Sequence, residues 1–226
     1  MSPARGRAPS MKGLDPIVAR LEAELDEKDR VREEALRVAR DLVRLAGVAI
    51  RGMHRGEDVK NPLDAVRDTT SRLREVLADH PDLWHGGAVE VALQEAAEAA
   101  IVHSVLGDAA LPDPREIGVT SAAYLLGLAD AVGELRRFAL DRLRAGKVED
   151  AMGFLDHMEE VFDALLRFDH PNAILPLRHK QDVARGLIER TRGELAVASH
   201  GLTLERRLRA LAEKRRRTSP RKRGDP

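Results

Sequence analysis

The sequence contains no cysteine, and this absence excludes several kinds of chemistry at once. Without thiols the chain can form no disulfide, no zinc–thiolate site and no cysteine nucleophile. Phenylalanine, tryptophan and tyrosine together supply only 3% of the residues. Because β-strands are enriched in aromatic and β-branched side chains, this shortage argues against a β-rich fold.

Long apolar runs and a net charge are also missing. No run approaches the roughly 18 apolar residues that a membrane span needs, and "MSPARGRAPSMKG" at the start has no hydrophobic segment after its basic residues. We therefore expect a cytoplasmic protein with no membrane partner. The formal net charge is zero, but residues 205–226 hold ten Lys or Arg against three Asp or Glu. Such a tail either binds polyanions through phosphate contacts or is a solubilising chain end.

What is abundant are helix-forming residues, separated by turn signals. Asp15 and Pro16 predict a helix start, and apolar residues then recur at helical spacing as far as Met53. Further helices are expected over 61–81, 82–106, from a cap at Thr120 or Ser121 to 144, over 148–168, 176–198 and 202–217. With no linker and no repeat, the chain reads as one all-α domain.

Four carboxylates stand in or beside apolar helical stretches. Glu95 and Glu98 lie one turn apart in "ALQEAAEAAIVHSVL", and Asp130 and Glu134 lie one turn apart in "YLLGLADAVGELRRF". Like charges at these spacings repel unless something positive lies between them. Glycines 127 and 133 flank Asp130 and weaken the helix, which predicts close approach by another helix or a ligand.

If the two helices face each other, these carboxylates form an all-oxygen site suited to Mg²⁺ or Mn²⁺. Such an ion polarises a phosphoryl oxygen and activates a bound water for phosphodiester hydrolysis. The alternative is ordinary surface charge: Glu98 could belong to a solvated stripe with Glu90 and Gln94, and Glu134 could pair with a neighbouring arginine. Spacing alone leaves both interpretations open.

The same residues carry a resemblance to a known family. "LQEAAEA" at 93–99 and "YLLGLADAVGELRR" at 124–137 resemble the motifs of the translin family, in particular its catalytic branch, translin-associated factor X. Weaker likeness runs from about residue 26 to 198, through "REEALRVARDLVRLAGVAIRGMHR" and "ILPLRHKQDVARGLIERTRGELA". The resemblance thus covers most of the chain.

The resemblance implies a seven-helix all-α bundle of long antiparallel helices that assembles into barrel-like octamers enclosing RNA. The expected division is a flexible lead (1–13), a translin-like helical domain (14–200) and a basic C-terminal helix or tail (201–226). It also implies a Mg²⁺-dependent endoribonuclease. Glu95, Glu98 and Asp130 would hold the metal, with Glu134 as a fourth catalytic acid. A homo-oligomer is the simpler expectation, and a separate translin-like subunit stays open.

RNA contacts are expected from a basic stripe on the first long helix, where Arg37, Arg44 and Arg51 recur every seven residues with Arg40 beside them. His85 lies where the family's RNA contacts are found. Each arginine could equally be surface charge paired with a residue such as Asp41.

Two functions follow as expectations. The first is a metal-dependent endoribonuclease that cleaves single-stranded RNA or single-stranded segments. The second is a non-catalytic, translin-like module that binds single-stranded RNA or DNA and uses the acids only structurally. A di-metal redox bundle fits poorly, because the Glu-x-x-His ligand spacing of such bundles is absent from the acidic motifs.

Overall fold

The computed structural model describes residues 11–218, and within them it contains eight α-helices and no strand. Six helices are long and two are single turns, against the seven expected. The all-α prediction is confirmed. The helices are α1 (Leu14–Arg55), α2 (Lys60–Val76), α3 (Pro81–Trp84), α4 (Gly87–Leu106), α5 (Pro114–Ile117), α6 (Ser121–Arg144), α7 (Val148–Leu165) and α8 (Arg178–Thr218).

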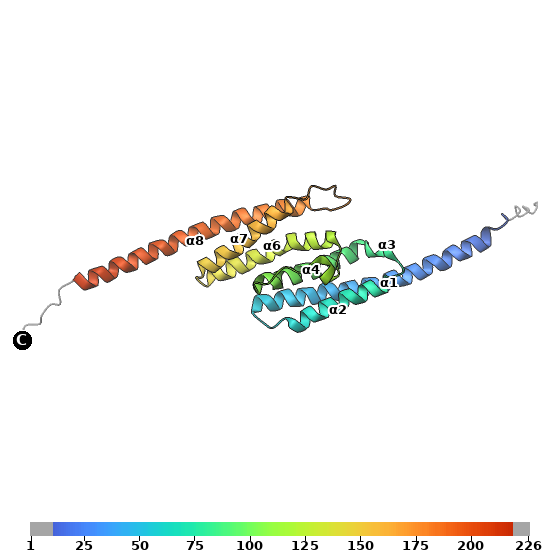
Figure 1. Cartoon of the computed structure of the whole chain (residues 1–226), viewed down its shortest axis with the longest axis horizontal. Helices are drawn as coiled ribbons and strands as arrows, with labels where there is room; N and C mark the ends of the chain where they lie inside the picture. The colour runs from blue at the N-terminus through green and yellow to red at the C-terminus, as the bar shows by residue number, and fades with distance from the viewer. Residues whose placement is uncertain (1–10, 219–226) are drawn as a thin grey trace, which may run out of the picture.

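The long helices run roughly along one axis, and neighbours in the chain lie antiparallel (Figure 1). Helices α1 and α2 form one side of the bundle, α7 and α8 form the other, and α4 and α6 lie between them. The α4 helix is apolar around most of its surface, as expected for a central helix, and buries Ala92, Leu93, Ala96 and Ala97 completely. The three small alanine side chains allow neighbouring backbones to approach closely.

The first part of α1 and the last part of α8 project beyond the bundle in opposite directions (Figure 1). Both projecting parts carry rows of exposed apolar side chains at helical spacing. On α1 the row is Leu14, Val18, Leu21 and Leu25, and on α8 it is Leu204, Leu208 and Leu211. None of the described helices is both long enough and apolar enough to cross a membrane.

Some predicted helix boundaries were wrong. The first helix begins at Leu14 with Gly13 as its N-cap (φ 81°), so Asp15 lies in the first turn instead of capping it. The helix expected over 82–106 is divided, because Gly86 adopts an extended conformation (φ −68°, ψ 139°) between α3 and α4. At the start of α6, Thr120 is the cap, and its hydroxyl accepts a hydrogen bond from the Ala123 amide at 2.9 Å.

At the C-terminal side, the helices expected over 176–198 and 202–217 are one continuous helix, α8. The predicted domain division stays a prediction. Residues 1–10 of the expected lead and 219–226 of the expected tail lie outside the described residues, and α8 continues through the expected boundary at 200.

Candidate functional site

The two carboxylate-bearing helices meet at Gly127. A β-carbon built on Gly127 would lie 2.6 Å from the Gln94 carbonyl oxygen and 2.9 Å from the Glu98 amide nitrogen, so only glycine fits against the α4 backbone. Gly133 faces a different neighbour, since a β-carbon there would meet only the Leu187 side chain of α8 at 4.0 Å. Because Asp130 lies one turn after Gly127, the close approach at Gly127 brings Asp130 beside the acids of α4.

Asp130 is held from two sides. Gln94 Nε2 on α4 donates to one carboxylate oxygen at 2.5 Å, and Lys180 Nζ on α8 donates to the other at 2.5 Å. Asp130 and Lys180 are both half-buried. Three helices therefore converge on this carboxylate, and the ammonium group of Lys180 supplies a positive charge within the acidic cluster.

Glu98 carries the largest perturbation in the cluster. Its partial burial, followed by repulsion from Asp130, Glu95 and Glu134, raises the pKa of the Glu98 carboxyl to about 8, against a smaller opposing effect of Lys180.

Glu95 is perturbed in the same direction. Burial and the nearby Asp130 charge raise the pKa of Glu95, while Lys180 opposes the shift. Within residues 11–218, no side chain or backbone group donates a hydrogen bond to the carboxylate of Glu95 or Glu98. The carboxyl groups of Glu95 and Glu98 are thus crowded beside Asp130 without a hydrogen-bond donor of their own among the described residues.

Glu134 lies on the next turn of α6, and its side chain contacts α1. His54 Nε2 donates a hydrogen bond to the Glu134 carboxylate, and Arg137 Nη1 lies 4.0 Å from the same oxygen. The His54 ring stacks on Phe138 with ring centroids 4.0 Å apart. Its other ring nitrogen, Nδ1, is buried and has no hydrogen-bond partner among the described residues.

The donor chemistry of the cluster fits a hard divalent cation, because crowded carboxylates with raised pKa values are relieved by a positive ion. The side chains as they stand are not gathered into a coordination shell: in the described part of the chain, no three Asp, Glu or His groups are positioned to hold a metal. The reason is visible at Asp130, whose two oxygens are engaged by Gln94 and Lys180. The Lys180 ammonium group thus supplies, beside Asp130, the positive charge that a metal ion would supply.

The residues expected to contact RNA are spread along the molecule. Arg37, Arg40, Arg44 and Arg51 all lie on α1, and Arg44 forms an exposed ion pair with Asp41 at 3.1 Å. His85 is exposed between α3 and α4, with Nδ1 3.2 Å from Glu90. Arg51 lines a surface hollow together with His54, which contacts Glu134 of the cluster.

Sequence reasoning missed Gln94, His54 and Lys180 as members of the site. Gln94 stands inside the first motif and offered a signal, because an amide one residue before Glu95 can donate to a carboxylate. His54 and Lys180 lie 80 and 50 residues along the chain from their partners Glu134 and Asp130, so no local spacing could connect them.

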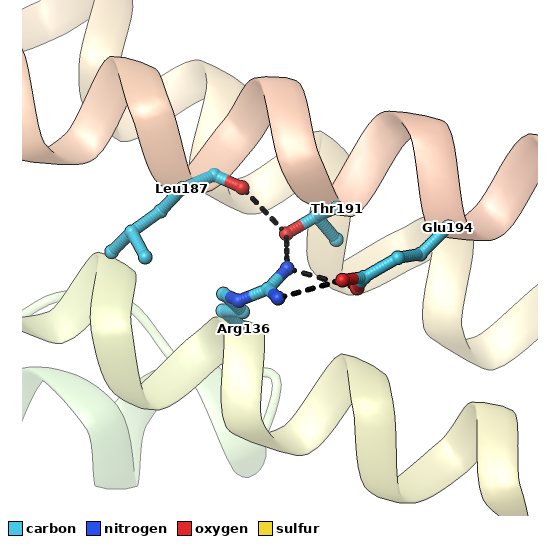
Figure 2. Close-up of polar contacts among 4 residues, drawn as sticks. All are labelled: Arg136, Leu187, Thr191 and Glu194. Atoms are coloured by element: carbon cyan, nitrogen blue, oxygen red, sulfur yellow. Dashed lines mark hydrogen bonds and ion pairs between the residues drawn. The ribbon is translucent and has the colours of Figure 1, made fainter.

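A second polar cluster on α6 faces α8 (Figure 2). The Arg136 guanidinium makes two hydrogen bonds to the Glu194 carboxylate, at 2.9 and 3.1 Å, and one to the fully buried Thr191 hydroxyl at 2.5 Å. Thr191 in turn donates to the Leu187 carbonyl at 2.7 Å. Arg136 is therefore the partner of Glu194, and the arginine that pairs with Glu134, as spacing allowed, is Arg137 at 4.0 Å.

Comparison with known proteins places this arrangement in a family. An uncharacterized protein of Methanocaldococcus jannaschii is 30% identical over 188 residues, which cover 82% of this chain and 84% of that protein.

Solved structures give the same result. The structure titled AfC3PO–duplex RNA complex is 30% identical with a TM-score of 0.74, and the crystal structure of AfC3PO is 31% identical with a TM-score of 0.75. Each match covers 81% of this chain and 97% of the other. Apo-NeC3PO shares the fold, with a TM-score of 0.73 at 21% identity over 84% of this chain and all of the other. Residues 31–191, which contain both acidic motifs, match the Translin family, and the chain belongs to that family.

Proposed function

We propose that this protein is a Mg²⁺-dependent endoribonuclease of the catalytic branch of the family, cleaving single-stranded RNA or single-stranded segments. The observation that carries the proposal is the crowding of four carboxylates at one site, where the pKa of Glu98 rises to about 8. A purely structural role gives no reason to gather so many acids at a helix–helix interface. The AfC3PO complex with duplex RNA supports RNA as the class of partner.

In this proposal Glu95, Glu98 and Asp130 hold the ion, which is Mg²⁺ or Mn²⁺. When bound, the ion polarises the phosphodiester and activates a water molecule for attack. The chain's own residues prepare the site: Gln94 and Lys180 fix the orientation of Asp130. Burial and the neighbouring acids raise the pKa of Glu98 to about 8, so its carboxyl would have to lose a proton in order to hold the ion. Glu134, the fourth acid, is oriented by His54.

We further propose that the chain works as a homo-oligomer, with a closed, barrel-like octamer as the expected assembly. The exposed apolar rows on the projecting parts of α1 and α8 support association, because such rows at helical spacing are typical of helix–helix interfaces. A separate translin-like subunit would pack against the same apolar rows.

The direct test incubates end-labelled single-stranded RNA, and in parallel a duplex of the same sequence, with the protein in Mg²⁺ or EDTA. A Glu95→Ala/Glu98→Ala variant is compared with Glu24→Ala/Glu27→Ala, a control pair of exposed glutamates with the same spacing on α1. We expect cleavage by the wild type and the control in Mg²⁺, and a loss of at least about 100-fold in the acidic-site variant.

The rival function, a non-catalytic single-stranded RNA- or DNA-binding protein, predicts a different result. All three proteins would then bind RNA and none would cleave it, with or without Mg²⁺. Equal cleavage by the acidic-site variant and the control would remove the acids from the mechanism.

A further inference from the structure

A surface hollow of about 480 Å³ lies beside the acidic cluster, between the last turns of α1 and α6. Four arginines line it with a single carboxylate, so its lining is strongly positive. The charged and ring side chains of the lining are Arg51, Arg55, Arg137, Arg144, His54 and Asp141. We call it the arginine hollow.

Much of this positive charge is available to a ligand. Arg144 is paired with Asp141 at 3.1 Å and Arg55 with Glu57 at 2.7 Å, but these pairs are exposed and therefore weak. Among residues 11–218, no carboxylate forms an ion pair with Arg51, whose guanidinium folds back over Gly47. Guanidinium groups present forked donors that match phosphate oxygens, so the arginine hollow suits a phosphate better than a neutral ligand.

The arginine hollow is joined to the acidic cluster through two residues. His54 lines the hollow and donates to Glu134, while Arg137 also lines it and lies 4.0 Å from the same Glu134 oxygen. His54 is almost completely buried, with 5% of its side chain exposed, and among the described residues Nδ1 has no hydrogen-bond partner. Because a neutral His54 that donates through Nε2 leaves Nδ1 as an acceptor, the donors that the hollow offers to a phosphate come from its arginines.

We propose that the arginine hollow binds a backbone phosphate of the RNA strand, next to the phosphodiester that lies at the acidic cluster. This inference deepens the proposed function and rests on it. Carboxylates repel an RNA backbone, so a phosphate anchor outside the cluster, attached to it through His54 and Glu134, would position the strand without neutralising the acids. The hollow would thereby fix the register of the strand.

The test measures the affinity for a fluorescent single-stranded RNA by anisotropy at several salt concentrations in EDTA, which prevents metal-dependent cleavage. Arg51→Ala/Arg144→Ala is compared with Arg115→Ala/Arg190→Ala, whose arginines are exposed on α5 and α8. We expect the hollow variant to bind about tenfold more weakly, with a salt dependence whose slope falls by about 0.7 for each phosphate that the protein no longer neutralises. The control variant keeps the wild-type slope.

A third variant, Arg51→Lys/Arg144→Lys, retains the charge but removes the forked donors, and we expect it to recover only part of the affinity. Three outcomes are distinguishable. A reduced slope in the hollow variant alone supports the inference, even if no cleavage is found. Wild-type slope and affinity in the hollow variant overturn it while leaving the nuclease proposal standing. Absence of RNA binding by the wild type overturns both.

Discussion

Helix α6 packs against α4 along one side and against α8 along another. The two interfaces differ in whether their charged side chains are paired with groups of opposite charge. Toward α8, the Arg136 guanidinium is matched by the Glu194 carboxylate and the Thr191 hydroxyl (Figure 2). Toward α4, about one turn and a half earlier, Asp130 lies near Glu95 and Glu98, and burial together with the Asp130 charge raises the pKa of both glutamates. One interface is balanced in charge and the other is not.

The difference separates a structural role from a functional one. A balanced, hydrogen-bonded cluster stabilises the packing of two helices and has no capacity left for a ligand. A crowded acidic cluster costs folding free energy, and the cation of the proposed function would relieve that cost. The two interfaces therefore predict opposite responses to substitution.

The largest effect on the free energy of unfolding is expected from substitutions of the α6 glycines that face α4 and α8. Gly127→Ala forces a β-carbon against the α4 backbone and should lower the free energy of unfolding by about 3 kcal/mol. Gly133→Ala, the matched control on the same helix, places its β-carbon at an ordinary packing distance and should stabilise the protein by about 1 kcal/mol. Urea denaturation of both variants measures the difference, and equal effects would mean that α4 and α6 do not meet at Gly127.

The pH dependence of stability sharpens the comparison. Because the pKa of Glu98 is raised from 4.5 to about 8 in the folded chain, its contribution to stability is complete below pH 4.5 and declines as pH rises toward 8. Glu98→Gln cannot ionise and should therefore be more stable than the wild type by several kcal/mol at pH 8, with a much smaller difference at pH 5.

Denaturation of both proteins at the two pH values tests this expectation, with Glu160→Gln on the exposed face of α7 as the control. A variant that is less stable than the wild type at pH 8 would show that the Glu98 carboxylate is stabilised by the fold, which contradicts the account of a crowded acidic cluster.

At the α8 interface the expected sign is the reverse. Arg136→Met removes three hydrogen bonds and should destabilise the protein by about 1.5 kcal/mol. Thr191 keeps its bond to the Leu187 carbonyl, which limits the destabilisation. RNA cleavage per folded molecule should be unchanged in this variant. Thermal unfolding and a cleavage assay on the same preparation measure both quantities, and a stability equal to that of the wild type would place Arg136 among unimportant surface charges.

The smallest effect concerns Lys180, which brings a positive charge from α8 into the acidic cluster. Its ammonium group donates a hydrogen bond to one oxygen of Asp130 and would compete there with a metal ion. Lys180→Met should therefore tighten the binding of Mn²⁺ by about tenfold. Isothermal titration calorimetry measures the change, with Lys60→Met on the exposed start of α2 as the control. Weaker or unchanged binding would show that the ammonium does not compete with the ion.

The sequence was informative where the relevant spacing is local. Helical periodicity and turn residues predicted the all-α fold, and the glycine before Asp130 predicted the close approach that Gly127 makes to α4. Local rules failed at Gly86, whose extended conformation separates α3 from α4 in a segment that apolar periodicity alone predicted as one helix. The positions of helix boundaries thus depended on the conformation of single residues such as Gly86.

The composition of the site was predicted only in part, for a physical reason. The acids are paired within single helices, so their spacing could be read directly, but what neutralises or orients them comes from other helices. Lys180 and His54 reach Asp130 and Glu134 only after α8 and α1 have packed against α6. No periodicity in one segment contains information about such a long-range pairing.

The close packing at Gly127 also bears on how the site responds to heat and pressure. Backbone atoms of α4 lie directly against the Gly127 position, so this contact leaves little space to compress and involves no long, flexible side chain. The separation of the two acid-bearing helices at this point is thus limited by van der Waals contact between their backbones. The proposed cleavage should therefore keep the same metal requirement from low temperature up to the onset of unfolding.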